Sequence, residues 1–90
     1  MPIKHTSSLS QVIQQLETHK ISVDEALSWM AYKGRNVRLS YSKEMQLWEC
    51  YWIVGEGSDD NNIAFVRNHE GMRDSVLGAV KMAKESGIDL

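Results

Sequence analysis

The most apolar segment of the chain covers residues 45–54, with the sequence MQLWECYWIV. Its aromatic and β-branched residues, bounded on both sides by turn-forming residues, predict a β-strand. Alternate positions in a strand point to opposite faces. One face carries Trp48, Cys50, Trp52 and Val54, and the other carries Met45, Leu47, Tyr51 and Ile53. A strand that is apolar on both faces is typical of a central strand with a covering layer on each side.

Two segments before this strand have the apolar spacing of helices. Residues 8–19 carry apolar side chains at i, i+3, i+4 and i+7, which predicts a first helix. Ser22 and Glu25 have the spacing of a capping box, which predicts a second helix over residues 23–33. We expect Gly34 to end this helix in a left-handed conformation.

Alternating apolar and polar residues predict two further strands, over residues 36–42 and 62–67. A two-residue turn at positions 43–44 would join the first of them to the central strand. That register places Arg38 opposite Glu49, where the two side chains would form a cross-strand ion pair. The three strands would form an antiparallel meander.

A last apolar stripe predicts a C-terminal helix over residues 69–86, capped by Asn68 and ended by Gly87. Gly78 is expected on the outer side of this helix. The order of elements is ααβββα, so the predicted fold is a small α+β domain with a three-stranded antiparallel meander packed against helices. We expect residues 1–90 to form one domain, with residues 1–6 as a flexible tail.

Composition narrows the expected cellular location and the class of function. The 90 residues have a formal net charge of −2 and one cysteine. No apolar segment approaches the ~20 residues of a membrane span, and the N-terminus has no apolar core of signal-peptide type. A single cysteine excludes an internal disulfide and suits a reducing compartment, so we expect a cytoplasmic protein. The acidic balance disfavours a broad basic surface for nucleic acid.

Residues able to carry catalysis or bind a metal are few and scattered. His5, His19 and His69 lack metal-ligand spacing, and Cys50 lies in the middle of an apolar strand, where a thiol is inert. The loop after the central strand gathers oxygen ligands suited to a hard cation, at Glu56, Asp59, Asp60, Asn61 and Asn62. Their spacing differs from that of an EF-hand. We therefore predict no enzymatic activity, no cofactor and no metal.

Residues 22–86 carry a helix, three antiparallel strands and a helix, and this order resembles the topology of double-stranded RNA-binding domains. That family has a lysine-rich motif at the start of its last helix, which contacts phosphates. Residues 68–74 of this chain hold more acid than base at that position. The cluster Lys33, Arg35 and Arg38 near the first strand is the alternative nucleic-acid site. A solvated strand edge is the competing interpretation.

The remaining apolar side chains suggest a surface for a partner. If all helices pack on the Trp52 face of the sheet, the opposite face is an exposed apolar patch, and such patches mark interfaces. If the C-terminal helix covers that face, no patch is left. Trp29 and Tyr32 lie off the apolar stripe of the second helix, and both residue types are common interface anchors. The candidate partner-binding residues are Trp29, Tyr32, Leu47, Tyr51 and Ile53.

These observations favour a small non-enzymatic protein-binding or regulatory protein, similar in size and charge to phage- or plasmid-encoded inhibitors. Its partner would be another protein or a second copy of the chain. A nucleic-acid-binding module is the alternative. The sequence leaves open whether the first helix packs on its own chain or on a neighbouring one.

Overall fold

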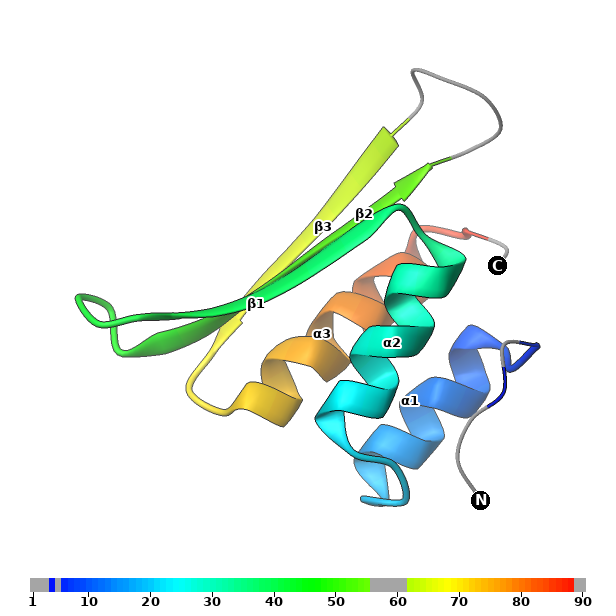
Figure 1. Ribbon diagram of the computed structural model, residues 1–90, viewed down its shortest axis with the longest axis horizontal. Coiled ribbons are helices and arrows are strands. Elements are labelled where there is room, and N and C mark those ends of the chain that lie inside the picture. Colours follow the sequence, from blue (N-terminus) through cyan, green and yellow to red (C-terminus); the bar gives the residue numbers. More distant parts are fainter. Residues whose placement is uncertain (1–3, 5, 56–61, 89–90) are drawn as a thin grey trace.

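The computed structural model describes residues 4, 6–55 and 62–88. The elements are α1 (Leu9–Glu17), α2 (Val23–Lys33), β1 (Asn36–Ser42), β2 (Leu47–Gly55), β3 (Asn62–His69) and α3 (Met72–Glu85). The strands form one antiparallel sheet in the order β1-β2-β3. The predicted α+β fold, with its ααβββα order and central β2, is therefore confirmed. All three helices lie on the same side of the sheet (Figure 1).

Trp52 is the centre of the core, which lies between the sheet and the helices. Its ring contacts Trp29 of α2 at a centroid distance of 6.0 Å and Phe65 of β3 at 6.2 Å. The indole N–H of Trp52 donates a hydrogen bond of 2.8 Å to the carbonyl oxygen of Met30. This bond links the second half of α2 to the sheet. It also satisfies the buried indole N–H, which would be costly to bury without a partner.

The start of α2 is formed as predicted, and its end is not. Ser22 and Glu25 make both hydrogen bonds of the capping box. Gly34, however, is extended, with φ −103° and ψ −155°, so the predicted left-handed conformation is wrong. A Cβ at Gly34 would lie 2.6 Å from Nε1 of Trp52 and 2.7 Å from the carbonyl oxygen of Ile53. Glycine is needed here because the end of α2 passes against β2 too closely for a side chain.

The predicted register of the β1–β2 hairpin is also wrong. Ser42 pairs with Leu47, so four residues form the turn instead of two. Lys-Glu is a poor pair for a type I′ turn, which needs positive φ at both positions. The longer turn has positive φ only at Gln46, at 56°. Arg38 consequently pairs with Tyr51 and not with Glu49. The shift is an even number of residues, so every side chain keeps its predicted face.

β3 continues through His69, which delays the start of α3. Asn68 pairs with Glu49 of β2, so the predicted capping role of Asn68 is wrong. Gly71 is the N-cap, and no side chain bonds there. Gly87 has φ +84° after the helix, in the predicted left-handed conformation. Gly78 is not on a bare outer face, because the aliphatic part of Arg67 packs directly over it.

α1 packs on its own chain. Val12 and Leu16 are fully buried. The guanidinium group of Arg73 in α3 donates hydrogen bonds to the carbonyl oxygens of Leu16 and Ile21, at 3.3 and 2.9 Å. These bonds hold the connection between α1 and α2 against α3. The helical layer is therefore complete within one chain, and α1 has no need of a neighbouring molecule.

Candidate functional site

The face of the sheet that points away from the helices is the candidate site, and we call it the outer face. The strand register places nine residues there in three rows that cross β1, β2 and β3. The rows are Asn36–Ile53–Ala64, Arg38–Tyr51–Val66 and Ser40–Glu49–Asn68. Among the residues that the structure describes, no helix or further strand covers this face (Figure 1).

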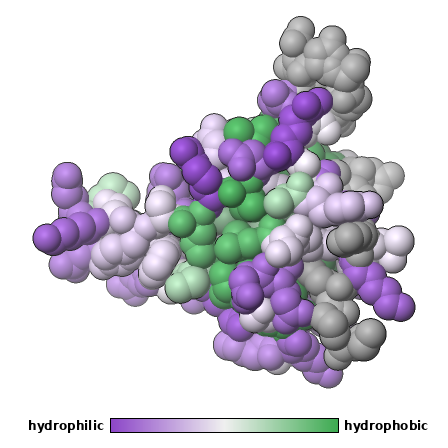
Figure 2. Space-filling model, in the orientation of Figure 1, coloured by the Kyte–Doolittle hydropathy of each residue, from purple (hydrophilic) through white to green (hydrophobic). Residues whose placement is uncertain are grey.

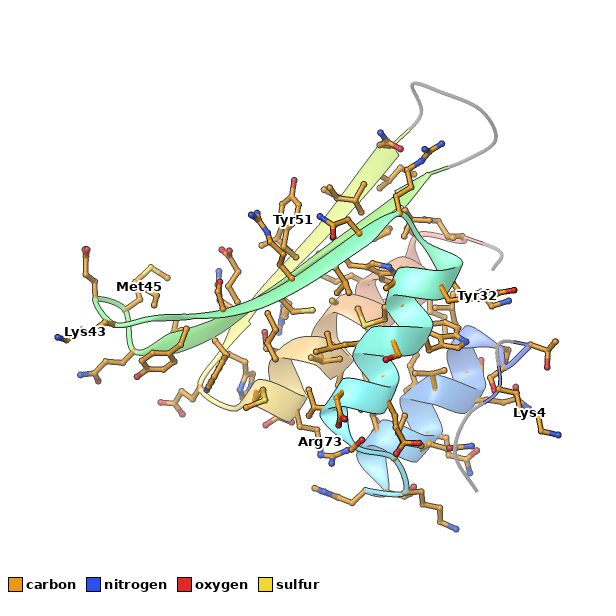
Figure 3. All side chains as sticks on the ribbon, viewed as in Figure 1. Lys4, Tyr32, Lys43, Met45, Tyr51 and Arg73 are labelled. Atoms are coloured by element: carbon orange, nitrogen blue, oxygen red, sulfur yellow. The ribbon has the colours of Figure 1, made fainter. Side chains whose placement is uncertain are left out.

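The middle of the outer face is apolar. Tyr51 and Ile53 are half-buried by their neighbours in the sheet, and Val66 is 36% exposed. Figure 3 shows Tyr51 projecting from the sheet on the side away from the helices. The rim carries the uncharged polar residues Asn36, Ser40 and Asn68. An apolar centre with a polar rim is the usual anatomy of a protein interface.

Two charged residues lie within the three rows, Arg38 and Glu49. The guanidinium carbon of Arg38 lies 5.2 Å from the centroid of the Tyr51 ring. At an exposed site such a cation–π contact contributes about 0.5–1 kcal/mol. It replaces the ion pair with Glu49 that the two-residue turn would have produced, and it favours one position of the Tyr51 ring. The outer face therefore presents an oriented aromatic ring with a cation above it.

Leu47 also lies on this side of the sheet. It is half-buried and pairs with Ser42 where the hairpin begins to turn. The predicted partner-binding residues Leu47, Tyr51 and Ile53 thus lie at alternate positions of β2 and share one face. The alternative in which α3 covers this face is excluded, because α3 packs on the opposite side (Figure 1).

The other two predicted partner-binding residues do not belong to this site. Trp29 is 2% exposed, and its indole N–H donates a hydrogen bond of 3.2 Å to the carbonyl oxygen of Ser7. Trp29 is thus a core residue, and its prediction as a partner-binding residue is wrong. Tyr32 is 60% exposed, but it lies on α2 in the helical layer (Figure 3). The outer face and Tyr32 are therefore on different sides of the molecule.

The exposure of a second aromatic residue, Tyr41, was not predicted. Tyr41 is 50% exposed, although it shares the helix-facing side of β1 with Val37 and Leu39. Its ring contacts Trp48 edge to face, at a centroid distance of 5.2 Å. The hairpin projects beyond the helices, with Met45 exposed near its tip (Figures 1 and 3). The helices therefore do not cover the end of the β1–β2 hairpin.

Element lengths are the signal in the sequence that could have identified this exposed end. The nine residues of β2 extend about 30 Å, whereas the 11 residues of α2 extend only about 16 Å. A helix of that length cannot cover the whole strand.

Figure 2 shows apolar surface in the region between the sheet and α2. The partly buried apolar residues of α2 and β1 are Val23, Leu27, Val37 and Leu39.

The residues considered for catalysis do not converge. Nδ1 of His69 accepts a 3.2 Å hydrogen bond from the backbone N–H of Gly71 and lies 3.7 Å from a carboxylate oxygen of Asp74. His19 is exposed after α1. His5 and residues 56–61 of the acidic loop lie outside the described residues. Within the described part of the chain, no group of three His, Cys, Asp or Glu residues could hold a metal ion.

Cys50 lies fully buried in the core, and burial raises the pKa of its thiol to about 12, from an ordinary value of 9.0. We expect iodoacetamide to leave Cys50 unmodified in the folded protein at pH 8 and to alkylate it in denaturant. Mass spectrometry gives the modified fraction. Equal modified fractions in the folded and the denatured protein would contradict a buried thiol.

The pKa of Cys50 is higher in the folded state than in the unfolded state. The contribution of Cys50 to the free energy of unfolding is therefore complete below pH 9 and is lost as the pH rises toward 12.

The basic residues are also dispersed. The side chain of Arg35 packs against Gly55 of β2, and Arg38 lies over Tyr51 on the outer face. Lys33 is half-buried at the end of α2. At the start of α3, Arg73 donates its hydrogen bonds to backbone carbonyl groups. The region that binds phosphate in double-stranded RNA-binding domains therefore holds an arginine that is already engaged.

Comparison of the chain with protein-family models, curated proteins and solved structures finds no match. Among the described residues, no helix combines the length and the apolar character needed to cross a membrane. Function is therefore inferred from the geometry of the sheet and from its side chains.

Proposed function

We propose that this chain is a small non-enzymatic protein-binding protein, of regulatory or inhibitory type, that acts through the outer face. The observation that supports this proposal is the position of Tyr51 and Ile53. They lie half-buried in the middle of a sheet whose three helices all pack on the other side. A partner that covers these two side chains would remove apolar surface from water, which is the main source of favourable free energy in association.

The three rows also supply specificity. The ring of Tyr51, oriented by Arg38, is an anchor of the kind that dominates binding energy in many interfaces. Arg38 and Glu49 beside it would reject a partner with the wrong charge at those points. The partner is thus a protein that presents apolar side chains with at least one acidic and one basic group nearby.

The test uses the variant Tyr51→Ala in affinity capture, with Tyr32→Ala as the matched control. Removing an anchor side chain at an interface costs about 2 kcal/mol or more, which is roughly 30-fold in affinity. We expect Tyr51→Ala to lose the captured protein and Tyr32→Ala to retain it, while both variants keep the wild-type melting temperature within a few degrees. Equal capture by the wild type and both variants would contradict the proposal.

A nucleic-acid-binding module remains the second candidate, because α2, the three strands and α3 have the layout that resembles double-stranded RNA-binding domains. That function predicts binding that falls steeply with salt and weakens when Arg35 and Arg38 are neutralised. The net charge of −2 and the engaged Arg73 argue against it. A gel-shift assay with duplex RNA at low salt tests this candidate, and the absence of a shift would eliminate it.

A further inference from the structure

We infer that the outer face pairs with the outer face of a second copy of this chain, about a two-fold axis that passes through Tyr51. This inference rests on the proposed function and names the partner. It follows from the arrangement of the nine residues in the three rows of the outer face, which is self-complementary about one diagonal. Leu47 lies on the same face beyond these rows and takes no part in the exchange.

The diagonal runs across the sheet from Ser40 on β1, through Tyr51 on β2, to Ala64 on β3. When two sheets pack face to face, a two-fold axis lies between them and parallel to both. An axis along this diagonal places each residue of the diagonal opposite its own copy. Ser40 and Ala64 have small side chains, so the two sheets can approach closely on either side of the paired Tyr51 rings.

The same axis exchanges the residues that flank the diagonal. Arg38 lies on one side of the diagonal and Glu49 on the other, so each Arg38 faces the Glu49 of the second copy. Ile53 faces Val66 in the same way, and Asn36 faces Asn68. Every exchange is favourable, because it pairs cation with anion, apolar with apolar, and amide with amide.

Other two-fold axes through Tyr51 do not give this match. An axis parallel to the strands places Glu49 opposite its own copy, and an axis across the strands does the same for Arg38. Like charges would then meet at the interface. The other diagonal places Arg38 against Ile53, which leaves a cation on an apolar group. Charge and hydrophobicity thus select one of the four simple arrangements.

Strand spacing is compatible with the pairing. Strands lie about 4.8 Å apart, and alternate residues of a strand repeat at about 6.7 Å. The diagonal exchange therefore leaves mismatches of about 3 Å between Arg38 and Glu49 and between Ile53 and Val66, and about 5 Å between Asn36 and Asn68. The long side chains of Arg38 and Glu49 can span their mismatch. Strands of the two copies would cross at roughly 70°, between the aligned and orthogonal modes of sheet packing.

The small size of the face favours a weak dimer. Three strands of five residues outline roughly 250 Å², which is well below the ~800 Å² per partner of a standard interface. We therefore expect a reversible dimer that forms at tens to hundreds of micromolar protein. It would compete with any partner that uses the same face.

Sedimentation velocity with charge-reversed variants tests the inference. In Arg38→Glu two acidic residues meet at each contact, and in Glu49→Arg two basic residues meet. We expect each variant alone to dimerise at least tenfold more weakly than the wild type. In an equimolar mixture of the two variants, the new acid at position 38 of one protein faces the new base at position 49 of the other. The unchanged Glu49 and Arg38 face each other at the second contact, so the mixture should dimerise as the wild type does.

The matched control is Lys20→Glu, a charge reversal at an exposed residue between α1 and α2, which should leave dimerisation unchanged. A wild type that stays monomeric to 1 mM, or a mixture that stays monomeric, would overturn the pairing. If the wild type is monomeric and Tyr51→Ala still abolishes capture of another protein, the inference that the partner is a second copy is wrong, and the proposed function stands. If Tyr51→Ala changes neither dimerisation nor capture, both fail.

Discussion

Replacing Trp29 with Ala is expected to lower the free energy of unfolding by about 3–5 kcal/mol. The side chain is 2% exposed, its ring packs against Trp52, and its indole N–H bonds to the carbonyl oxygen of Ser7. The substitution leaves a cavity between α2 and the sheet and removes the bond that holds the start of α1. A domain of 90 residues has a total stability of about 5–13 kcal/mol. The loss is thus a large part of the whole.

Chemical denaturation of the variant gives this free energy directly. Tyr32→Ala, three residues later on the same helix, is the control, and we expect it to change the stability by less than about 1 kcal/mol because Tyr32 is 60% exposed. If Trp29→Ala unfolds at the same denaturant concentration as Tyr32→Ala, Trp29 is not a core residue and its role as a partner-binding residue would be open again.

Replacing Gly34 with Ala is expected to cost about 2–5 kcal/mol, although it adds only one methyl group. The new Cβ would lie 2.6 Å from Nε1 of Trp52 and 2.7 Å from a backbone oxygen of β2, so α2 and β2 must move apart. That movement also weakens the buried hydrogen bond from Trp52 to Met30. Thermal and denaturant unfolding measure the cost.

Gly71→Ala is the matched control for this substitution. Its backbone has φ −102°, which suits any residue, and the nearest atom to a new Cβ is a carboxylate oxygen of Asp74 at 3.2 Å, at the end of a side chain that can move. We expect a change within about 1 kcal/mol. Equal effects at Gly34 and Gly71 would show that the close approach of α2 to β2 is not what Gly34 permits.

Local signals in the sequence predicted the parts of the fold that depend on a few neighbouring residues. Ser22 and Glu25 mark the start of α2 because the capping box is made within one turn. Alternation in residues 36–42 and 45–54 separates the two faces of the sheet because the side-chain period of a strand is two. The side chains of Tyr51 and Trp52 therefore lie on the predicted opposite faces.

Features that depend on distant parts of the chain could not be predicted. The spacing of α2 shows Trp29 off the apolar stripe. It does not show that the carbonyl oxygen of Ser7 accepts its indole N–H or that Trp52 packs against its ring. An apolar pattern on both faces of β2 suggests cover on both, whereas all three helices share one side (Figure 1). Which side a helix takes depends on the whole packing, and no single segment encodes it.

The hairpin register shows how an error in the predicted length of one turn changes the predicted cross-strand pairs. A two-residue turn and a four-residue turn place the same residues on the same faces, so hydrophobic pattern alone cannot distinguish them. The choice depends on whether two adjacent residues accept positive φ. The length of the turn decides whether Arg38 pairs with Glu49 or with Tyr51 in its own sheet. Because Arg38 pairs with Tyr51, the charges of Arg38 and Glu49 do not neutralise each other and both are available for a partner on the outer face.

The central claim is that the outer face binds protein, and site-specific photo-crosslinking tests it most directly. A benzophenone amino acid at position 51 is compared with the same group at position 32, in purified protein and in the cells that express it. The account predicts protein adducts at position 51, of the chain itself or of another protein, and few at position 32. Adducts at position 32 with none at position 51 would contradict it.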